Sequence, residues 1–233
     1  MRVVTLSLFL ISFSILLAQS TDSEIKKIER REGGAVVLLE YPELKVQGET
    51  EKAINQSIQM AILNMFDPNA AGSLESTISE FIRSQKELYP DVQKTFSKKV
   101  QIVFQNESIL TLRVEESSQT GSGPSQSKVA FTNIDLSTGQ TMALSDLLKT
   151  GVSNQVDQLA EAQFQADQTS ITAGQTIKWP GIQSLSNFSL NEGGLTFYLD
   201  PTSPNPNPGT QVTLPLARIE KLLKDRFATQ LQR

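Results

Sequence analysis

The stretch VQIVFQNESILTLRV, residues 100–114, decides the fold class of this chain. Apolar residues alternate with polar neighbours in two runs, which are Val100, Ile102 and Phe104, then Leu110, Leu112 and Val114. A side-chain period of two is typical of a β-strand with one buried face. Only a short polar link separates the two runs, so the stretch predicts an antiparallel hairpin over 98–116.

Helical spacing precedes this hairpin. Apolar residues recur every three to four positions in two segments, which predicts helices over 50–66 and 73–89. Ser73 stands where the second helix needs an N-cap, because its hydroxyl can accept a free backbone N–H of the first turn. Pro90 is expected to end that helix, since the residue before a proline disfavours helical geometry.

The alternation resumes after the hairpin. The pattern predicts a strand over 128–136, a helix marked by Val152 to Phe164, a hairpin over 185–200, a strand over 211–214 and a closing helix over 216–229. Gly193 and Gly194 favour the turn of the second hairpin because glycine accepts positive φ. Pro215 is expected to be the first residue of the closing helix.

The N-terminal half completes the prediction of the architecture. Residues 35–39 are apolar and predict a strand that ends before Pro42, while the polar segment 21–34 is expected to be a flexible lead-in. Helices followed by strands and a closing helix indicate an α+β fold with helices packed on one face of an antiparallel sheet. We expect a single domain over 35–233.

Residues 1–20 have the layout of a secretory signal peptide. Arg2 is basic, residues 3–17 are mostly apolar, and Ala18 and Ser20 are small residues near a cleavage site. The apolar run is short for a membrane span, which needs about 20 residues. We therefore expect an extracytoplasmic protein, periplasmic or secreted, with no membrane span after cleavage. Retention of the leader as an anchor is the alternative.

Composition restricts the chemistry. The chain has no histidine and no cysteine, which excludes serine–histidine triads, thiolate nucleophiles and zinc sites built from these residues. The formal net charge is −4, and basic residues occur in runs no longer than two, so nucleic acid is not an expected partner. No catalytic residue, cofactor or metal site is predicted, and the oligomeric state stays open.

Two loops are the candidate binding sites. Trp179, beside Lys178, could be a stacking platform for a sugar or an anchor for a protein, or it could cover the sheet. The segment 117–127 contains Ser122, Gly123 and Ser125 and could be a recognition loop or a plain mobile link between strands. The proline-rich segment 200–209 could be a binding edge or a crossover connection.

Glycan hydrolysis would need two carboxylates that converge on one bond. Glu115 and Glu116 are adjacent on a predicted strand, so their side chains point to opposite faces and cannot converge on one bond. Asp135 and Asp146 are expected in turns and helix capping. Three sequons begin at Asn55, Asn106 and Asn187, and such triplets often arise by chance.

The order of landmarks resembles a known family. These landmarks are Tyr41-Pro42-Glu43-Leu44, Ile54-Asn55, the segment from Asn133 to Leu148, Gly194-Leu195-Thr196-Phe197-Tyr198 and Leu214-Pro215. Together they resemble the RsiV-like extracytoplasmic domain, a module of RsiV-type anti-sigma factors and of PdaC-type peptidoglycan deacetylases. The resemblance extends over residues 35–230, and its most specific piece is the segment from Asn133 to Leu148.

The resemblance implies a binding or sensing role outside the membrane. RsiV-type modules recognise lysozyme, so the expected partner is a cell-wall polymer or a wall-active protein such as lysozyme. The chain departs from the family because it has only a leader ahead of the module and Gly121–Ser125 in place of a histidine-containing turn. A secreted inhibitor of a lysozyme-like enzyme would be a variant of this function. A small carboxylate-dependent glycan hydrolase is the alternative.

Overall fold

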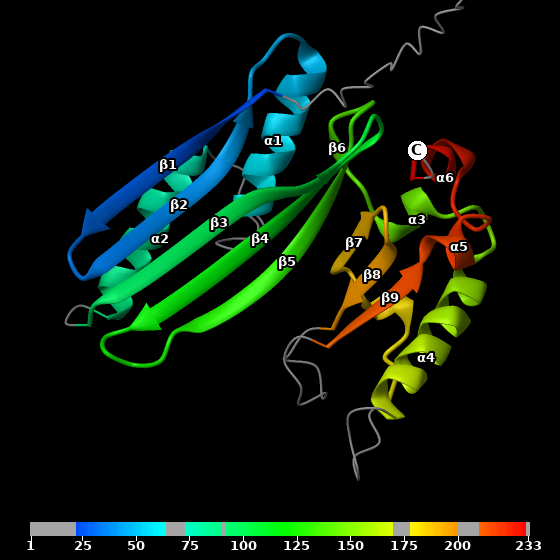
Figure 1. Ribbon diagram of the computed structural model, residues 1–233. Helices are drawn as coiled ribbons and strands as arrows, with labels where there is room; N and C mark the ends of the chain where they lie inside the picture. Colours follow the sequence, from blue (N-terminus) through cyan, green and yellow to red (C-terminus); the bar gives the residue numbers. More distant parts are fainter. Residues whose placement is uncertain (1–21, 64–72, 90–91, 170–177, 200–209, 232–233) are drawn as a thin grey trace, which may run out of the picture.

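The computed structural model describes residues 22–63, 73–89, 92–169, 178–199 and 210–231, which form two β-sheets with helices around them (Figure 1). The larger sheet has the order β1 (Ser23–Glu32), β2 (Ala35–Leu44), β3 (Lys94–Gln105), β4 (Ile109–Thr120), β5 (Gln126–Asp135) and β6 (Gln140–Thr141). The smaller sheet has the order β7 (Phe188–Asn191), β8 (Gly194–Tyr198) and β9 (Gln211–Pro215). The predicted leader lies outside the described residues.

The helices are distributed over both sheets. Their bounds are α1 (Glu49–Leu63), α2 (Leu74–Leu88), α3 (Leu144–Leu147), α4 (Ser153–Thr169), α5 (Leu216–Ile219) and α6 (Asp225–Leu231), with a 3₁₀ turn η1 (Ile182–Ser184). In Figure 1, α1 and α2 lie behind the long sheet, and the smaller sheet with α4 lies to the right of it. The predicted cap of α2 is confirmed, because Ser73 Oγ accepts from the Ser76 N–H at 3.2 Å.

β1 corrects the expectation of a flexible lead-in. The segment pairs antiparallel with β2 over its whole length, from Ser23 opposite Leu44 to Glu32 opposite Ala35. Its many charged side chains hide the strand in the sequence, but such charges suit an edge strand, which they protect from pairing with other chains. β2 also continues through Pro42. It pairs with β3 only as far as Glu40, so the proline lies where fewer ladder bonds are needed.

The larger sheet is mixed, not purely antiparallel as predicted. β2 and β3 run parallel, with Ala35 opposite Lys94 and Glu40 opposite Lys99. α1 and α2 lie between these strands in the chain, and a parallel pair needs such a long crossover. The sequence pattern indicates each strand but not which strands become neighbours across residues 45–93.

The predicted hairpin over 98–116 is confirmed as β3 and β4, which pair antiparallel. The register shifts between Ile102 and Phe104, so that Val103 is an extra residue in β3. Such a bulge reverses the face to which later side chains point. Ile102 therefore packs toward α1 and α2, while Phe104 packs toward the smaller sheet.

Two hydrophobic cores lie on opposite faces of the larger sheet. One core joins β2–β5 to α1 and α2 and includes Val37, Ile58, Ile78 and Leu112. The other joins Ile109 to the smaller sheet and to α4–α6 and includes residues such as Phe164, Phe197 and Phe227. The α+β class is therefore confirmed, but the prediction of helices on one face of one sheet is wrong.

Buried polar groups join the two sheets. Asn133 Nδ2 donates to the Phe188 carbonyl at 2.9 Å, and Thr111 Oγ1 lies within 3.0 Å of the Leu190 carbonyl oxygen. Both side chains are almost fully buried. Because a buried polar group that lost its partner would cost about 1–3 kcal/mol, these bonds fix how β7 lies across β4 and β5.

The predicted closing helix is interrupted. α5 ends at Ile219 and α6 begins at Asp225, and the residues between them pair with another segment. The Lys149 N–H donates to the Leu222 carbonyl, and the Lys224 N–H donates to the Leu147 carbonyl, both at 2.9 Å. These bonds flank an isolated β-bridge between Leu148 and Leu223, and they take the place of helical bonds between α5 and α6. Pro215 is the N-cap of α5 and the last residue of β9.

Candidate functional site

The face of β1–β5 opposite α1 and α2, here called the ladder face, carries a row of alternating charges. The pairing register places Lys27 of β1 opposite Glu40 of β2, Glu40 opposite Lys99 of β3, and Lys99 opposite Glu115 of β4. Neighbouring residues of the row therefore have opposite charges across four strands. We call these four residues the charge ladder.

The charge ladder is held by ion pairs. Glu40 Oε2 lies 3.1 Å from Lys27 Nζ, and Glu40 Oε1 lies 3.6 Å from Lys99 Nζ. Glu115 is paired with the guanidinium of Arg113, its neighbour on the same face of β4. The side chains of Lys99 and Glu115 keep 44% and 40% of their surface exposed, so solvent and ligands can reach them.

A shallow cleft of about 320 Å³ lies at the β3–β5 end of the charge ladder. It is lined by Ser97, Lys99, Arg113, Glu115, Glu116, Ser117, Ser127, Lys128 and Val129. Most of these side chains offer hydrogen-bond donors or acceptors. The cleft is therefore suited to a polar ligand.

Apolar residues of β5 border the charge ladder. Val129 lies opposite Glu115, and Phe131 lies opposite Arg113. The ring of Phe131 stacks on Tyr198 of β8, with centroids 4.1 Å apart. Asn187 completes this border, because its side chain accepts from the Phe131 N–H and donates to the Val129 carbonyl. The carboxamide thus occupies the free edge of β5, where a further strand would bind.

Glu116 points to the opposite face from Glu115, as predicted. Its Oε2 lies 3.7 Å from Nζ of Lys98, which is 3% exposed and donates to the Ile62 carbonyl at 2.6 Å. Burial lowers the pKa of Lys98 to about 8, although the nearby Glu116 carboxylate opposes the shift. This pair belongs to the contact between β3, β4 and α1.

The charge ladder contains a carboxylate pair that sequence reasoning missed. Glu40 and Glu115 share the ladder face with Lys99 between them, so their backbones are about 10 Å apart, which is two strand spacings. A general acid needs a raised pKa. The hydrogen bond from Lys27 instead lowers the pKa of Glu40. This arrangement suits ligand binding better than proton transfer.

Trp179 packs against the core of the smaller sheet. Its ring centroid lies 5.4 Å from that of Phe164 and 6.4 Å from that of Phe197. The indole N–H donates to Asp157 Oδ1 at 2.8 Å, and the same oxygen accepts from the Ile182 N–H. The indole therefore covers this part of the core, while neighbouring Lys178 is exposed.

The segment 117–127 is mostly strand, which corrects the expectation of a mobile loop. β4 extends to Thr120 and β5 begins at Gln126, so the turn is confined to 121–125. Ser122, Gly123 and Ser125 lie at this tip, at the end of the long sheet in Figure 1. Trp179 packs instead against the core of the smaller sheet. The segment 200–209 lies outside the described residues.

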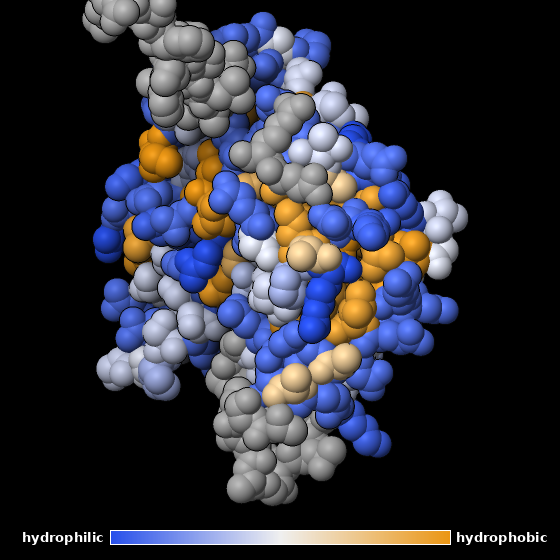
Figure 2. Space-filling view, turned by 45° about the vertical axis from the view of Figure 1, so that its right-hand side comes forward, coloured by the Kyte–Doolittle hydropathy of each residue, from blue (hydrophilic) through white to orange (hydrophobic). Residues whose placement is uncertain are grey.

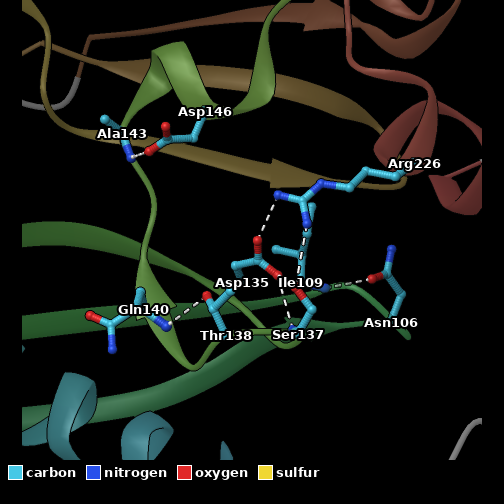
Figure 3. Close-up of polar contacts among 9 residues, drawn as sticks. All are labelled: Asn106, Ile109, Asp135, Ser137, Thr138, Gln140, Ala143, Asp146 and Arg226. Carbon is cyan, nitrogen blue, oxygen red and sulfur yellow. Dashed lines mark hydrogen bonds and ion pairs between the residues drawn. The ribbon is translucent and has the colours of Figure 1, made fainter.

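Asp135 and Asp146 serve turns and capping, as expected (Figure 3). Asp135 accepts from the Ser137 N–H and hydroxyl and pairs with Arg226 at 2.6 Å. Burial would raise the pKa of Asp135, but these bonds outweigh it and hold the pKa below its ordinary value. Asp146 Oδ2 accepts from the Ala143 N–H at the start of α3.

The three sequon asparagines are engaged within the fold. Asn55 is buried and exchanges two hydrogen bonds with the backbone of Leu44. Asn106 accepts from the Ser108 and Ile109 N–H groups in the β3–β4 turn. Asn187 holds the edge of β5. Each side chain thus has a structural role at its site.

The described residues hold no group of three or more aspartate or glutamate side chains close enough together to ligate a metal ion. None of the helices in the described ranges is both long and apolar enough to cross a membrane. From the side of the smaller sheet, the surface is largely hydrophilic, with hydrophobic residues in several separate patches (Figure 2).

Known structures with the same architecture belong to a domain family of unknown function. This chain is similar to a DUF3298 family protein from Pseudomonas aeruginosa, with a TM-score of 0.68 and 17% identity over 89% of this chain and 96% of that chain. It is also similar to a DUF3298 family member from Bacteroides fragilis, with a TM-score of 0.65 and 14% identity over 90% and 97%. At these identities the likeness shows the fold alone. No family model matches the sequence, and no curated protein matches it.

Proposed function

We propose that this chain is a non-enzymatic extracytoplasmic binding module for a cell-wall polymer or a wall-active protein such as lysozyme. The observation that carries the proposal is the ladder face, which presents paired charges and a shallow cleft to solvent. Paired charges fix side-chain positions before a ligand arrives, which reduces the entropy lost on binding. The resemblance to RsiV-type modules supplies the class of ligand.

The test is binding of the purified full chain to isolated peptidoglycan and to lysozyme. Peptidoglycan is sedimented with the protein, and lysozyme is immobilised for a pull-down, each at physiological salt and at high salt. We expect retention on at least one of these two ligands. Retention on neither would overturn the proposed function.

The alternative function is a carboxylate-dependent glycan hydrolase, and the pair of Glu40 and Glu115 on one face is its best support. The lowered pKa of Glu40 argues against an acid role for this residue. Release of reducing ends from peptidoglycan separates the two functions. Turnover by the wild-type chain that is abolished by Glu115→Gln would replace the binding proposal with this one.

A further inference from the structure

The geometry of the ladder face repeats at the spacing of the strands. Lys27, Glu40, Lys99, Glu115 and Val129 occupy one row across β1–β5. Five neighbouring strands give four spacings, so the row is about 19 Å long. A pyranose ring in an extended polysaccharide advances by a similar distance to one strand spacing. A glycan lying across the strands would therefore place about one sugar over each spacing, between two neighbouring side chains of the row.

The chemistry of the row alternates in the same way. Lys27 and Lys99 are donors only, whereas Glu40 and Glu115 are acceptors only when ionised. Ser97, Ser117 and Ser127 lie in the next row and can both donate and accept. A sugar hydroxyl also donates and accepts, so it can bridge a lysine and a glutamate that are already paired. An anionic ligand would instead have to compete with Glu40 and Glu115 for the cations.

The apolar border completes the fit to a sugar. Val129 and the stacked rings of Phe131 and Tyr198 lie beside the charge ladder, at the end where Glu115 stands. A pyranose has hydroxyls around its rim and C–H groups on its faces, and these faces pack against apolar side chains. The β5 end thus offers an apolar wall beside polar groups, the combination that ligand sites use for orientation.

We propose that the ladder face binds an extended, uncharged polysaccharide strand laid across β1–β5, with Lys99, Arg113 and Glu115 as its central hydrogen-bonding residues. This inference rests on the proposed binding function and narrows its ligand to the glycan part of the wall. The cleft at Lys99 and Glu115 has room for one sugar, and Lys27 and Glu40 would continue the contact toward β1. Trp179 and the hairpin tip lie outside this surface.

The experiment measures the affinity of the full chain for N-acetylglucosamine oligomers by isothermal titration calorimetry. We expect affinity to rise from the disaccharide to the tetrasaccharide and to change little for the hexasaccharide, because the row has room for about four sugars. Lys99→Met and Glu115→Gln should each weaken tetrasaccharide binding about tenfold or more. Glu80→Gln on the exposed side of α2 is the matched control and should bind like the wild type.

The possible outcomes distinguish failure of the glycan proposal from failure of the proposed binding function. Wild-type affinity in Lys99→Met and Glu115→Gln, with folding confirmed by circular dichroism, would overturn the placement of the glycan on the ladder face. Retention on lysozyme without binding to peptidoglycan or the oligomers would overturn the glycan assignment and leave the binding function standing. Binding to none of these ligands would overturn both.

Discussion

Ser57 of α1 donates a hydrogen bond of 2.6 Å to the carbonyl of Gly139, which lies 82 residues later in the β5–β6 turn. Gly139 has φ +72°, and a Cβ there would come within 2.5 Å of Ala53 Cβ and 2.9 Å of the Ile54 backbone nitrogen. The turn thus docks directly on the backbone of α1. This contact joins α1 to the segment from Asn133 to Leu148.

Gly139→Ala is expected to lower the free energy of unfolding by about 3 kcal/mol or more, because backbone strain and a steric clash act together. Urea denaturation measures the change. Gly151→Ala is the matched control, since Gly151 has a similar φ of +82° but open space around it. Gly151→Ala should lower the free energy of unfolding by only about 1 kcal/mol. Equal losses in the two variants would show that α1 yields to the added methyl group.

Trp179→Ala is expected to lower stability by about 2 kcal/mol, less than the ~3–5 kcal/mol of a fully buried tryptophan, because the indole is half-buried. Trp179→Phe should lose less, since it keeps ring contacts and removes only the bond to Asp157. Thermal melts compare both with Lys178→Ala, an exposed neighbour whose loss should change stability by at most about 0.5 kcal/mol. An unchanged melt for Trp179→Ala would contradict the packing.

Lys98 makes stability depend on alkaline pH. Its pKa in the folded state is about 8, below the unfolded value of 10.5, so the unfolded chain binds more protons between these values. The free energy of unfolding therefore rises as pH increases from about 8 toward 10.5, by at most about 3 kcal/mol. Lys98→Met should remove this rise, whereas Lys52→Met, at an exposed site, should keep it. Urea titrations at several pH values make the comparison, and a rise that survives in Lys98→Met would assign it to another group.

Asp135 contributes stability that acid removes. Its folded pKa lies below the ordinary value of 3.8, so the contribution is present above pH 3.8 and disappears as pH falls through the folded pKa. Asp135→Asn should therefore be less stable than the wild type at pH 6 and closer to it at pH 2. Asp225→Asn, whose side chain is 88% exposed, is the control and should follow the wild type throughout. Parallel curves for Asp135→Asn and the wild type would contradict the shift.

Local patterns of the sequence predicted local structure well. The hairpin over 98–116, the Ser73 cap and the glycine turn before β8, where Gly194 has φ +129°, depend on neighbouring residues. Most of the missed features depend on distant residues. The charge of β1 masked its strand, and the parallel pairing of β2 with β3 has no signal in either strand. The sequence indicates one helix in place of α5 and α6, because the hydrogen bonds that separate them are made with Leu147 and Lys149, which lie far away in the chain.

The candidate site was missed for the same reason. Lys27, Glu40, Lys99 and Glu115 come from four separate strands and become a row only when the order and register of the sheet are known. That Glu115 and Glu116 point to opposite faces could be predicted, because successive side chains of a strand alternate between its two faces. For Trp179 the sequence left two roles open, a binding platform or a cover for the sheet, because its partner Asp157 lies on a different element.

The parallel pairing of β2 with β3 has a consequence for the speed of folding. β3, β4 and β5 form consecutive antiparallel pairs, and such local contacts form early because little chain must be ordered between them. β2 can join this sheet only after residues 45–93 have closed a long loop. That closure costs entropy before the hydrogen bonds between β2 and β3 can form and offset it. We therefore expect refolding in the slow, millisecond-to-second range of proteins with non-local strand pairing, with the β1–β2 hairpin added last.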